Sequence, residues 1–219
     1  MIKKIFPLSF ICFLIFSCQK EIQNEALDSE LLACPRPVPP TGECGALRTQ
    51  TPGGWGATPH GNNPGTYLHR NFANAFPNGL TIGCATGGSL TVTSAQAITR
   101  LLPTGGKAAK LTGQSSNPAS IKNVLVGHLI ALSLSSGFDL YDQAFGSSQT
   151  NLSNMIIGSG PFAGKTVGAF IQIANDVIGG CSNDYSVQDV LNTAAAINES
   201  YVDGTTRSSF LTCPDGGPR

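Results

Sequence analysis

The sequence predicts a mainly α-helical domain that contains a small β-hairpin and is stabilised by disulfides. Apolar residues recur with helical spacing in four segments after residue 93, and capping residues, Gly or Pro bound each segment. Two short alternating segments flank Gly87-Gly88. Four cysteines are spread over residues 44–213. We therefore expect one compact domain of about four helices at 44–213, followed by a short tail at 214–219.

The first part of this domain, residues 49–84, is expected to be rich in loops. Gly, Pro and Asn cluster at 51–56, 61–65 and 76–79, where they favour turns. Aromatic residues between the turns indicate an ordered region. Residues 80–84 and 89–93 alternate apolar and polar side chains, which predicts a β-hairpin.

The first two helices are predicted from capping signals. Thr93 to Gln96 forms a capping box that opens a helix through Leu102, which Pro103 ends. Asn117 as N-cap with Pro118 at the first position starts the second helix. The second helix is apolar on nearly every side as far as residue 134, so it is expected to lie at the centre of the domain.

Two more helices are predicted in the last third of the chain. The third runs from about Lys165 to Ile178, and Gly179-Gly180 ends it. The fourth begins at Ser186, with Asp189 three residues later as in a capping box.

The N-terminal residues 1–17 have the pattern of a secretory signal. Lys3 and Lys4 precede an apolar run, 5–16, that is shorter than the roughly 20 residues needed to span a bilayer. Residues 14–18 resemble a bacterial lipobox, whose cysteine becomes the lipid-bearing first residue of the mature protein. The resemblance implies a membrane anchor at Cys18. Residues 18–43, acidic and then Pro-rich, are expected to form a tether.

The start of this tether bears on location. Gln19-Lys20-Glu21 resembles, in part, the signal that sends lipoproteins of Bacteroidota to the outer face of the outer membrane. The resemblance implies an outer-membrane lipoprotein at the cell surface. A periplasm-facing location is the alternative.

Five cysteines remain after Cys12 leaves with the signal and Cys18 takes the lipid. In an exported protein they should be mostly oxidised, and we expect Cys34, in the tether, to be the unpaired one. The predicted bridges are Cys181–Cys213 and Cys44–Cys84, and the first alternative is Cys84–Cys181 with Cys44–Cys213. The paired short spacings of zinc sites are absent, so no metal or other cofactor is expected.

The charges are distributed unevenly. No Asp or Glu occurs between residues 45 and 138, whereas acidic residues predominate from Asp139 onward. The basic part could bind an anionic partner such as an acidic polysaccharide, or the two halves could neutralise each other, which the low density of charge favours. No Lys/Arg cluster is interleaved with aromatic residues, so nucleic-acid binding is not expected. The basic residues concerned are Arg48, Arg70, Arg100, Lys107, Lys110 and Lys122.

Catalytic motifs are missing from the sequence. It has no Gly-x-Ser-x-Gly, no His-Glu-x-x-His, no P-loop and no dinucleotide fingerprint. A small secreted hydrolase that uses Asp139, Asp142 or a histidine is the alternative function. His128 lies on the apolar stripe of the central helix, where a hydrogen-bonded core role is expected.

Non-catalytic binding is the first functional expectation, with a glycan or another protein as ligand or a role in the cell envelope. The loop-rich segment 52–76 could present polar and aromatic side chains on a helical scaffold. Trp55 could instead be the apolar plug of this region, which is the interpretation that its few large apolar neighbours favour. The candidate contact residues are Trp55, His60, Tyr67, His69 and Arg70.

Four segments carry a resemblance to a module found in secreted and surface proteins of Bacteroidota. The resemblance covers roughly residues 44–213, nearly the whole expected domain. It implies an exported location and these domain limits, and it implies no catalytic residue. The segments are Arg48 to Gly56, Phe76 to Cys84, Gly160 to Gly168 and Ile197 to Gly204.

Overall fold

The computed structural model describes residues 44–214. The expected signal, the expected lipid attachment at Cys18, the expected tether with its unpaired Cys34, and residues 215–219 of the expected tail lie outside the described residues. In chain order the described elements are α1 (Pro52–Trp55), α2 (Pro64–Ala75), β1 (Leu80–Gly83), β2 (Ser89–Val92), α3 (Ala95–Leu101), β3 (Gln114–Ser116), α4 (Val124–Tyr141), the 3-10 helix η1 (Leu152–Asn154), β4 (Ile156–Ile157), α5 (Val167–Gly179), α6 (Val187–Glu199) and β5 (Leu211–Thr212).

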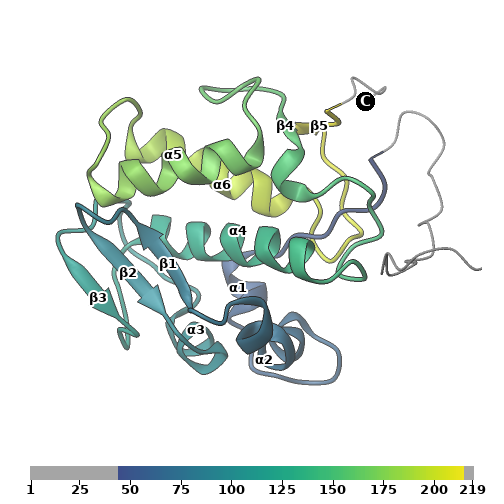
Figure 1. Ribbon diagram of the computed structural model, residues 1–219, viewed down its shortest axis with the longest axis horizontal. Helices are drawn as coiled ribbons and strands as arrows, with labels where there is room; N and C mark the ends of the chain where they lie inside the picture. Colours follow the sequence, from purple (N-terminus) through teal and green to yellow (C-terminus); the bar gives the residue numbers. More distant parts are fainter. Residues whose placement is uncertain (1–43, 215–219) are drawn as a thin grey trace, which may run out of the picture. The chain divides into compact units, whose positions relative to one another are not determined.

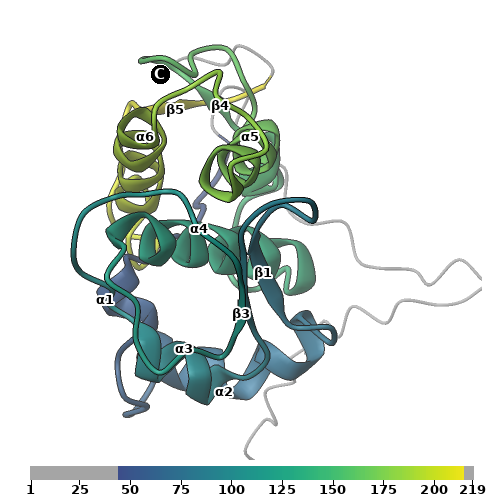
Figure 2. The ribbon, with the colours of Figure 1, turned by 90° about the vertical axis from the view of Figure 1, so that its left-hand side faces the viewer.

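Helix α4 runs through the middle of the domain. Helices α5 and α6 lie on one side of it, and α1, α2, α3 and the larger sheet lie on the other (Figures 1 and 2). Its apolar residues face all directions because both sides are covered. By length and composition α4 is the one described helix that could cross a membrane, but 67% of it is buried inside the domain. It is the core helix that the sequence predicted.

The described part is a mixed α/β domain, and the expectation of about four helices was too low. Six α-helices and two small sheets are present among residues 44–214. The two extra helices, α1 and α2, lie in the region expected to be loops. The side chains of Thr51 and Asn63 cap them by accepting hydrogen bonds from Gly54 N and Thr66 N. Each cap precedes a proline, so the signal was present in the sequence.

The predicted hairpin is confirmed, and a third strand extends it. β1 and β2 pair antiparallel, with Leu80 opposite Val92, and β3 pairs with β2 in parallel. β3 is polar and its three residues are exposed, so no alternation of apolar and polar side chains indicated this strand in the sequence. A second sheet pairs β4 with β5.

The start predicted for α4 was wrong by several residues. Asn117 does not cap a helix, because it adopts a positive φ of 46° and its side chain bridges to Thr93. The N-cap is Asn123, whose Oδ1 accepts a hydrogen bond from Leu125 N. At α3 the cap is Ser94 and not Thr93.

The two last helices are close to their predicted limits. α5 ends at Gly180, which adopts the left-handed conformation with φ 81°. Ser186 caps α6, and its Oγ both accepts from Asp189 N and donates to Asp189 Oδ2.

Two disulfides are present among the described residues, and the preferred pairing was wrong. The bridges are Cys44–Cys213 and Cys84–Cys181, which is the alternative pairing. The β4–β5 pairing places Cys213 near the N-terminal end of α5, whereas Cys181 follows the C-terminal end of this helix. The end of α5 instead meets the β1–β2 turn, where Gly88 N donates to Gly179 O. Cys44–Cys213 therefore links the two ends of the domain, and Cys84–Cys181 links the hairpin to the end of α5.

Candidate functional site

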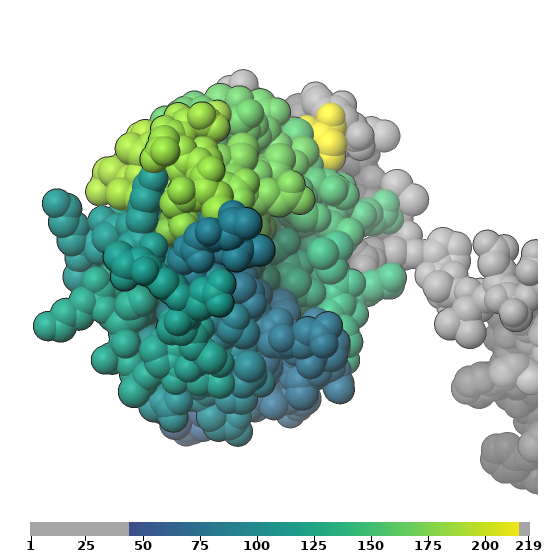
Figure 3. All heavy atoms as spheres, turned by 60° about the vertical axis from the view of Figure 1, so that its left-hand side comes forward, coloured from purple at the N-terminus to yellow at the C-terminus, as the bar shows by residue number. Residues whose placement is uncertain are grey.

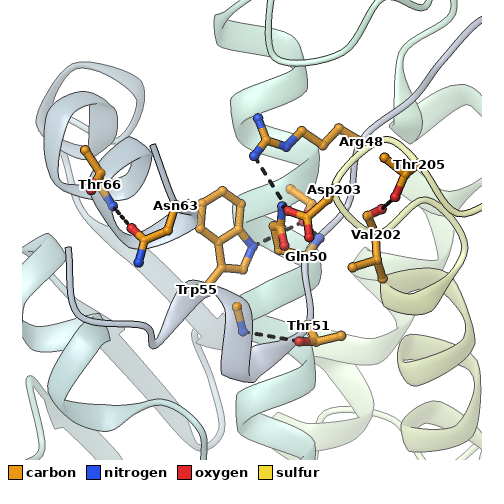
Figure 4. A network of polar contacts seen from close by, with 11 residues as sticks. Arg48, Gln50, Thr51, Trp55, Asn63, Thr66, Val202, Asp203 and Thr205 are labelled. Carbon is orange, nitrogen blue, oxygen red and sulfur yellow. Dashed lines mark hydrogen bonds and ion pairs between the residues drawn. The ribbon is translucent and has the colours of Figure 1, made fainter. Parts of the chain in front are cut away.

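The segment before α1 docks on the turn after α6 (Figure 4). Thr49 forms an isolated parallel bridge with Val202. Its backbone N–H donates to Tyr201 O, and its side-chain hydroxyl donates to Asn198 O. Thr49 is fully buried, so these contacts satisfy its polar groups inside the core.

Gln50 and Arg48 extend this docking to Asp203. Gln50 Nε2 donates to Asp203 Oδ1 over 2.7 Å, and Arg48 Nη2 lies 3.9 Å from the same oxygen. The Arg48 guanidinium also lies over the rings of Phe145 and Tyr67, 5.2 and 5.9 Å from their centroids. Such cation–π contacts are worth about 0.5–2 kcal/mol. Arg48 is therefore engaged on both sides by contacts that hold the fold together.

Trp55 is a core residue. It is fully buried, and its indole Nε1 donates to Ala131 O and to Ser135 Oγ, each over 3.2 Å. Its ring packs against Phe138 and Phe145, with centroids 5.2 and 6.0 Å away. The expectation that Trp55 is a surface contact is therefore wrong, and the interpretation as an apolar plug is the one that fits. The ring is buried because α1 places it directly against the middle of α4.

Tyr67 is half-buried at the edge of the same aromatic cluster. Its hydroxyl donates to Asp142 Oδ2 over 2.7 Å, at the C-terminal cap of α4. Burial raises the pKa of Tyr67 above its ordinary value, and the hydrogen bond to Asp142 raises it further. The phenol therefore stays protonated at physiological pH and acts as a hydrogen-bond donor between α2 and α4.

The other three candidate contact residues do not join Tyr67 in one site. His69 Nε2 lies 2.9 Å from Thr99 Oγ1, which places this ring against α3. Two residues along a helix turn through about 200°, so Tyr67 and His69 lie on opposite sides of α2. His60, in the loop before α2, and Arg70, on α2, are exposed. The candidate set is thus divided between the core edge, the α2–α3 contact and open surface.

The carboxylates suggested for hydrolysis hold the end of α4. Asp139 is nearly fully buried, and its Oδ2 accepts a hydrogen bond from Leu152 N over 2.7 Å. Asp142 accepts from Tyr67 and from Ala144 N. His128 lies about 16 Å from Asp139 along the axis of α4. It is half-buried against Asn198, whose side-chain amide donates to the His128 carbonyl. Burial lowers the pKa of His128. His128 is therefore too far from either carboxylate to form an acid–base pair with it.

Within residues 44–214, one ion pair joins the basic part of the chain to the acidic part. Arg48, from the basic part, approaches Asp203 from the acidic part. Lys110 Nζ donates to Ser182 O and to Asn183 Oδ1, so it too contacts the C-terminal half. The remaining basic residues of this set are exposed, namely Arg70, Arg100, Lys107 and Lys122.

Three of the four segments that carry the resemblance make contacts within the domain. Arg48 to Gly56 contacts Ile197 to Gly204 through Thr49 and Gln50, although some 150 residues separate Thr49 from Asn198. Phe76 to Cys84 supplies a ring to the cluster around Phe138 and a half-cystine to the bridge with α5. Comparison of the chain with protein-family models, with curated proteins and with solved structures yields no match.

Proposed function

We propose that this protein is a lipid-anchored, non-catalytic module of the cell envelope, held at the outer membrane through Cys18 and binding a glycan or a protein. The observation that carries the proposal is the pair of disulfides, because disulfides persist in oxidising compartments outside the cytoplasm. The pattern of residues 1–18 supports the same location. The resemblance to the Bacteroidota surface module supports it as well.

The absence of catalysis is proposed from the roles of the reactive side chains. Asp139 and Asp142 hold the end of α4, and His69 contacts Thr99. In this proposal the three side chains serve the fold, because their hydrogen bonds join α4 to η1, α4 to α2 and α2 to α3.

Ligand contacts, in this proposal, come from the exposed residues of the candidate set. His60 and Arg70 fulfil this condition, and Arg100 is a further exposed cation on α3, which packs near α2. An anionic ligand should bind more weakly as salt increases, because exposed charges are screened beyond about 10 Å at 0.1 M. A glycan array probed with the domain, at low and at high salt, tests this part of the proposal. Arg70→Ala should weaken any binding that is found.

The anchor is tested by a pair of cysteine substitutions. Cys18→Ala should move the protein from the membrane fraction to the soluble exported fraction, because it removes the acyl chains that hold it. Cys34→Ala is the matched control, since Cys34 also lies before the domain and should leave the protein on the membrane. A Cys18→Ala protein that stays in the membrane fraction would contradict the proposed anchor.

A further inference from the structure

The junction between the β1–β2 turn and the end of α5 brings together three groups that can bind a metal. Sulfur atoms of Cys84 and Cys181 and a carboxylate oxygen of Asp176 all lie within 4.8 Å of one another. Cys181 and Asp176 are exposed, and Cys84 is half-buried. In the face shown in Figure 3 the blue-teal atoms of the hairpin meet the yellow-green atoms of α5 at the surface. The two sulfurs are joined in a disulfide, so the group is not a metal site in this oxidised form.

The backbone at this junction is held by hydrogen bonds that do not depend on the disulfide. Asp176 O accepts from Cys181 N over 2.8 Å and from Ser182 N over 3.1 Å. Across the junction, Gly83 N donates to Asn175 Oδ1 over 2.9 Å, next to Asp176. These bonds connect the backbone beside Cys84, Asp176 and Cys181 without involving the sulfur–sulfur bond.

We propose that reduction of the Cys84–Cys181 disulfide by a thiol or phosphine creates a binding site for Zn²⁺ or a similar thiophilic divalent cation. Two thiol molecules, or one phosphine and one water molecule, supply the two electrons and two protons that convert the sulfur–sulfur bond into two cysteine thiols. The second product is one external disulfide or one phosphine oxide. Metal binding then displaces the two thiol protons. The ligands are the two thiolates, the Asp176 carboxylate and a water molecule.

The geometry of the junction fits such a site. Tetrahedral zinc, with zinc–sulfur bonds of about 2.3 Å and zinc–oxygen bonds of about 2.0–2.2 Å, places its ligand atoms about 3.3–3.8 Å apart. The Cα atoms of Cys84 and Cys181 are 6.5 Å apart, so side-chain rotation alone can separate the sulfurs to this distance. Gly179 leaves the space that the Cys84 sulfur occupies, because a Cβ on this residue would collide with that sulfur.

Two features of the surroundings favour a cation with thiolate ligands, and they act against the nearby Lys110 ammonium, which donates to Ser182 O. The C-terminal end of α5 carries a partial negative charge, which attracts a positive ion. Thr86 Oγ1 lies 3.2 Å from Cys181 Sγ, where the hydroxyl can donate to the thiolate. Within residues 44–214, no comparable group of three ligands includes Cys44 or Cys213. The two disulfides thus differ in what their reduction produces.

Cobalt binding to the full exported chain tests the proposal. The Cys34→Ser form is kept in detergent and reduced with a phosphine until peptide mapping shows free thiols at Cys84 and Cys181 and an intact Cys44–Cys213 bridge. Co²⁺ should then produce thiolate-to-cobalt charge-transfer absorption and the visible bands of tetrahedral cobalt, with one ion per chain. Zn²⁺ should remove both signals. The oxidised protein should give neither signal.

Two matched variants decide the role of the carboxylate. Asp176→Asn should weaken Co²⁺ binding at least about tenfold, because it removes one ligand. Asp184→Asn is the control, since this exposed carboxylate lies three residues beyond Cys181 and is not one of the three ligands. Equal binding by Asp176→Asn and the unsubstituted protein would overturn the proposal. So would a selectively reduced protein that gives no thiolate–cobalt band while its circular dichroism stays native.

Discussion

The segment 48–55 and the outer surface of α2 have similar residues but opposite roles. Both contain aromatic or charged side chains among Gly, Pro and Asn, and both were expected to contribute ligand contacts. The structure buries Trp55 completely and ties Gln50 to Asp203, whereas His60 and Arg70 remain exposed. The Gly-rich, Trp-containing segment 48–55 therefore belongs to the core. The less conspicuous residues of α2 and its loop are the ones available to a partner.

The largest effect should come from Trp55→Ala. The substitution removes a fully buried ring and leaves a cavity beside Phe138, which should cost about 3–5 kcal/mol. For a domain of this size we expect the melting temperature to fall by about 10 °C. Thermal unfolding followed by circular dichroism measures the change. A melting temperature within a degree of the unsubstituted protein would place the ring on the surface and abolish the difference between the two regions.

Ser135→Ala should have the next largest effect. Ser135 Oγ accepts hydrogen bonds from Gln50 N and Trp55 Nε1, and both donors are buried. Loss of this acceptor should cost about 1–3 kcal/mol, because Gln50 N is left unsatisfied. The adjacent Ser136→Ala is a matched control, since Ser136 is also buried but accepts neither of these two bonds. Denaturant unfolding should rank Ser135→Ala well below Ser136→Ala in stability.

A smaller effect should appear as a dependence of stability on pH. Burial lowers the pKa of His128, so the unfolded chain binds a proton at a higher pH than the folded chain does. The contribution of His128 is complete above the unfolded pKa of about 6.5 and is lost as the pH falls below it. The melting temperature should therefore decrease less between pH 7.5 and pH 5 in His128→Gln than in the unsubstituted protein. Equal decreases in the two proteins would contradict the assignment.

The smallest effects on stability are expected at Arg70 on α2 and at His60 in the loop before it. His60→Ala and Arg70→Ala should each change the free energy of unfolding by no more than about 0.5 kcal/mol, because both side chains are exposed. Chemical unfolding of the two variants measures this. A loss of more than 1 kcal/mol in either variant would show that this surface also serves the fold.

The sequence predicted the elements whose signals are local. The α5 stop at Gly180, the α6 cap at Ser186 and the hairpin around Gly87-Gly88 follow from capping and turn chemistry within a few residues. α2 was missed because abundant Gly, Pro and Asn concealed the Asn63-Pro64 start signal. The preferred disulfide pairing failed for a different reason. The observed pairing depends on the β4–β5 sheet and on the contact of α5 with the hairpin, and neither contact has a local signal in the sequence.

The site residues divide in the same way. His128, expected from its apolar stripe to be a hydrogen-bonded core residue, is half-buried, and its Nδ1 lies 3.4 Å from Asn198 Nδ2. The burial of Trp55 could be weighed but not decided from the sequence, because it depends on α1 meeting the middle of α4. The group proposed to bind a metal, at Cys84, Asp176 and Cys181, could not be predicted from the sequence either. Its members come together only through the packing of α5 on the hairpin.

Fluorescence of the one tryptophan in the chain tests most directly the claim that the 48–55 segment belongs to the core. We predict a blue-shifted emission maximum and almost no quenching by iodide in the native protein, because the ring is fully buried and its Nε1 is bonded to Ala131 O and Ser135 Oγ. Unfolding in guanidinium should shift the emission to the red and make the ring accessible to iodide. A native protein whose tryptophan already emits in the red and is quenched as strongly as the unfolded chain would contradict the account.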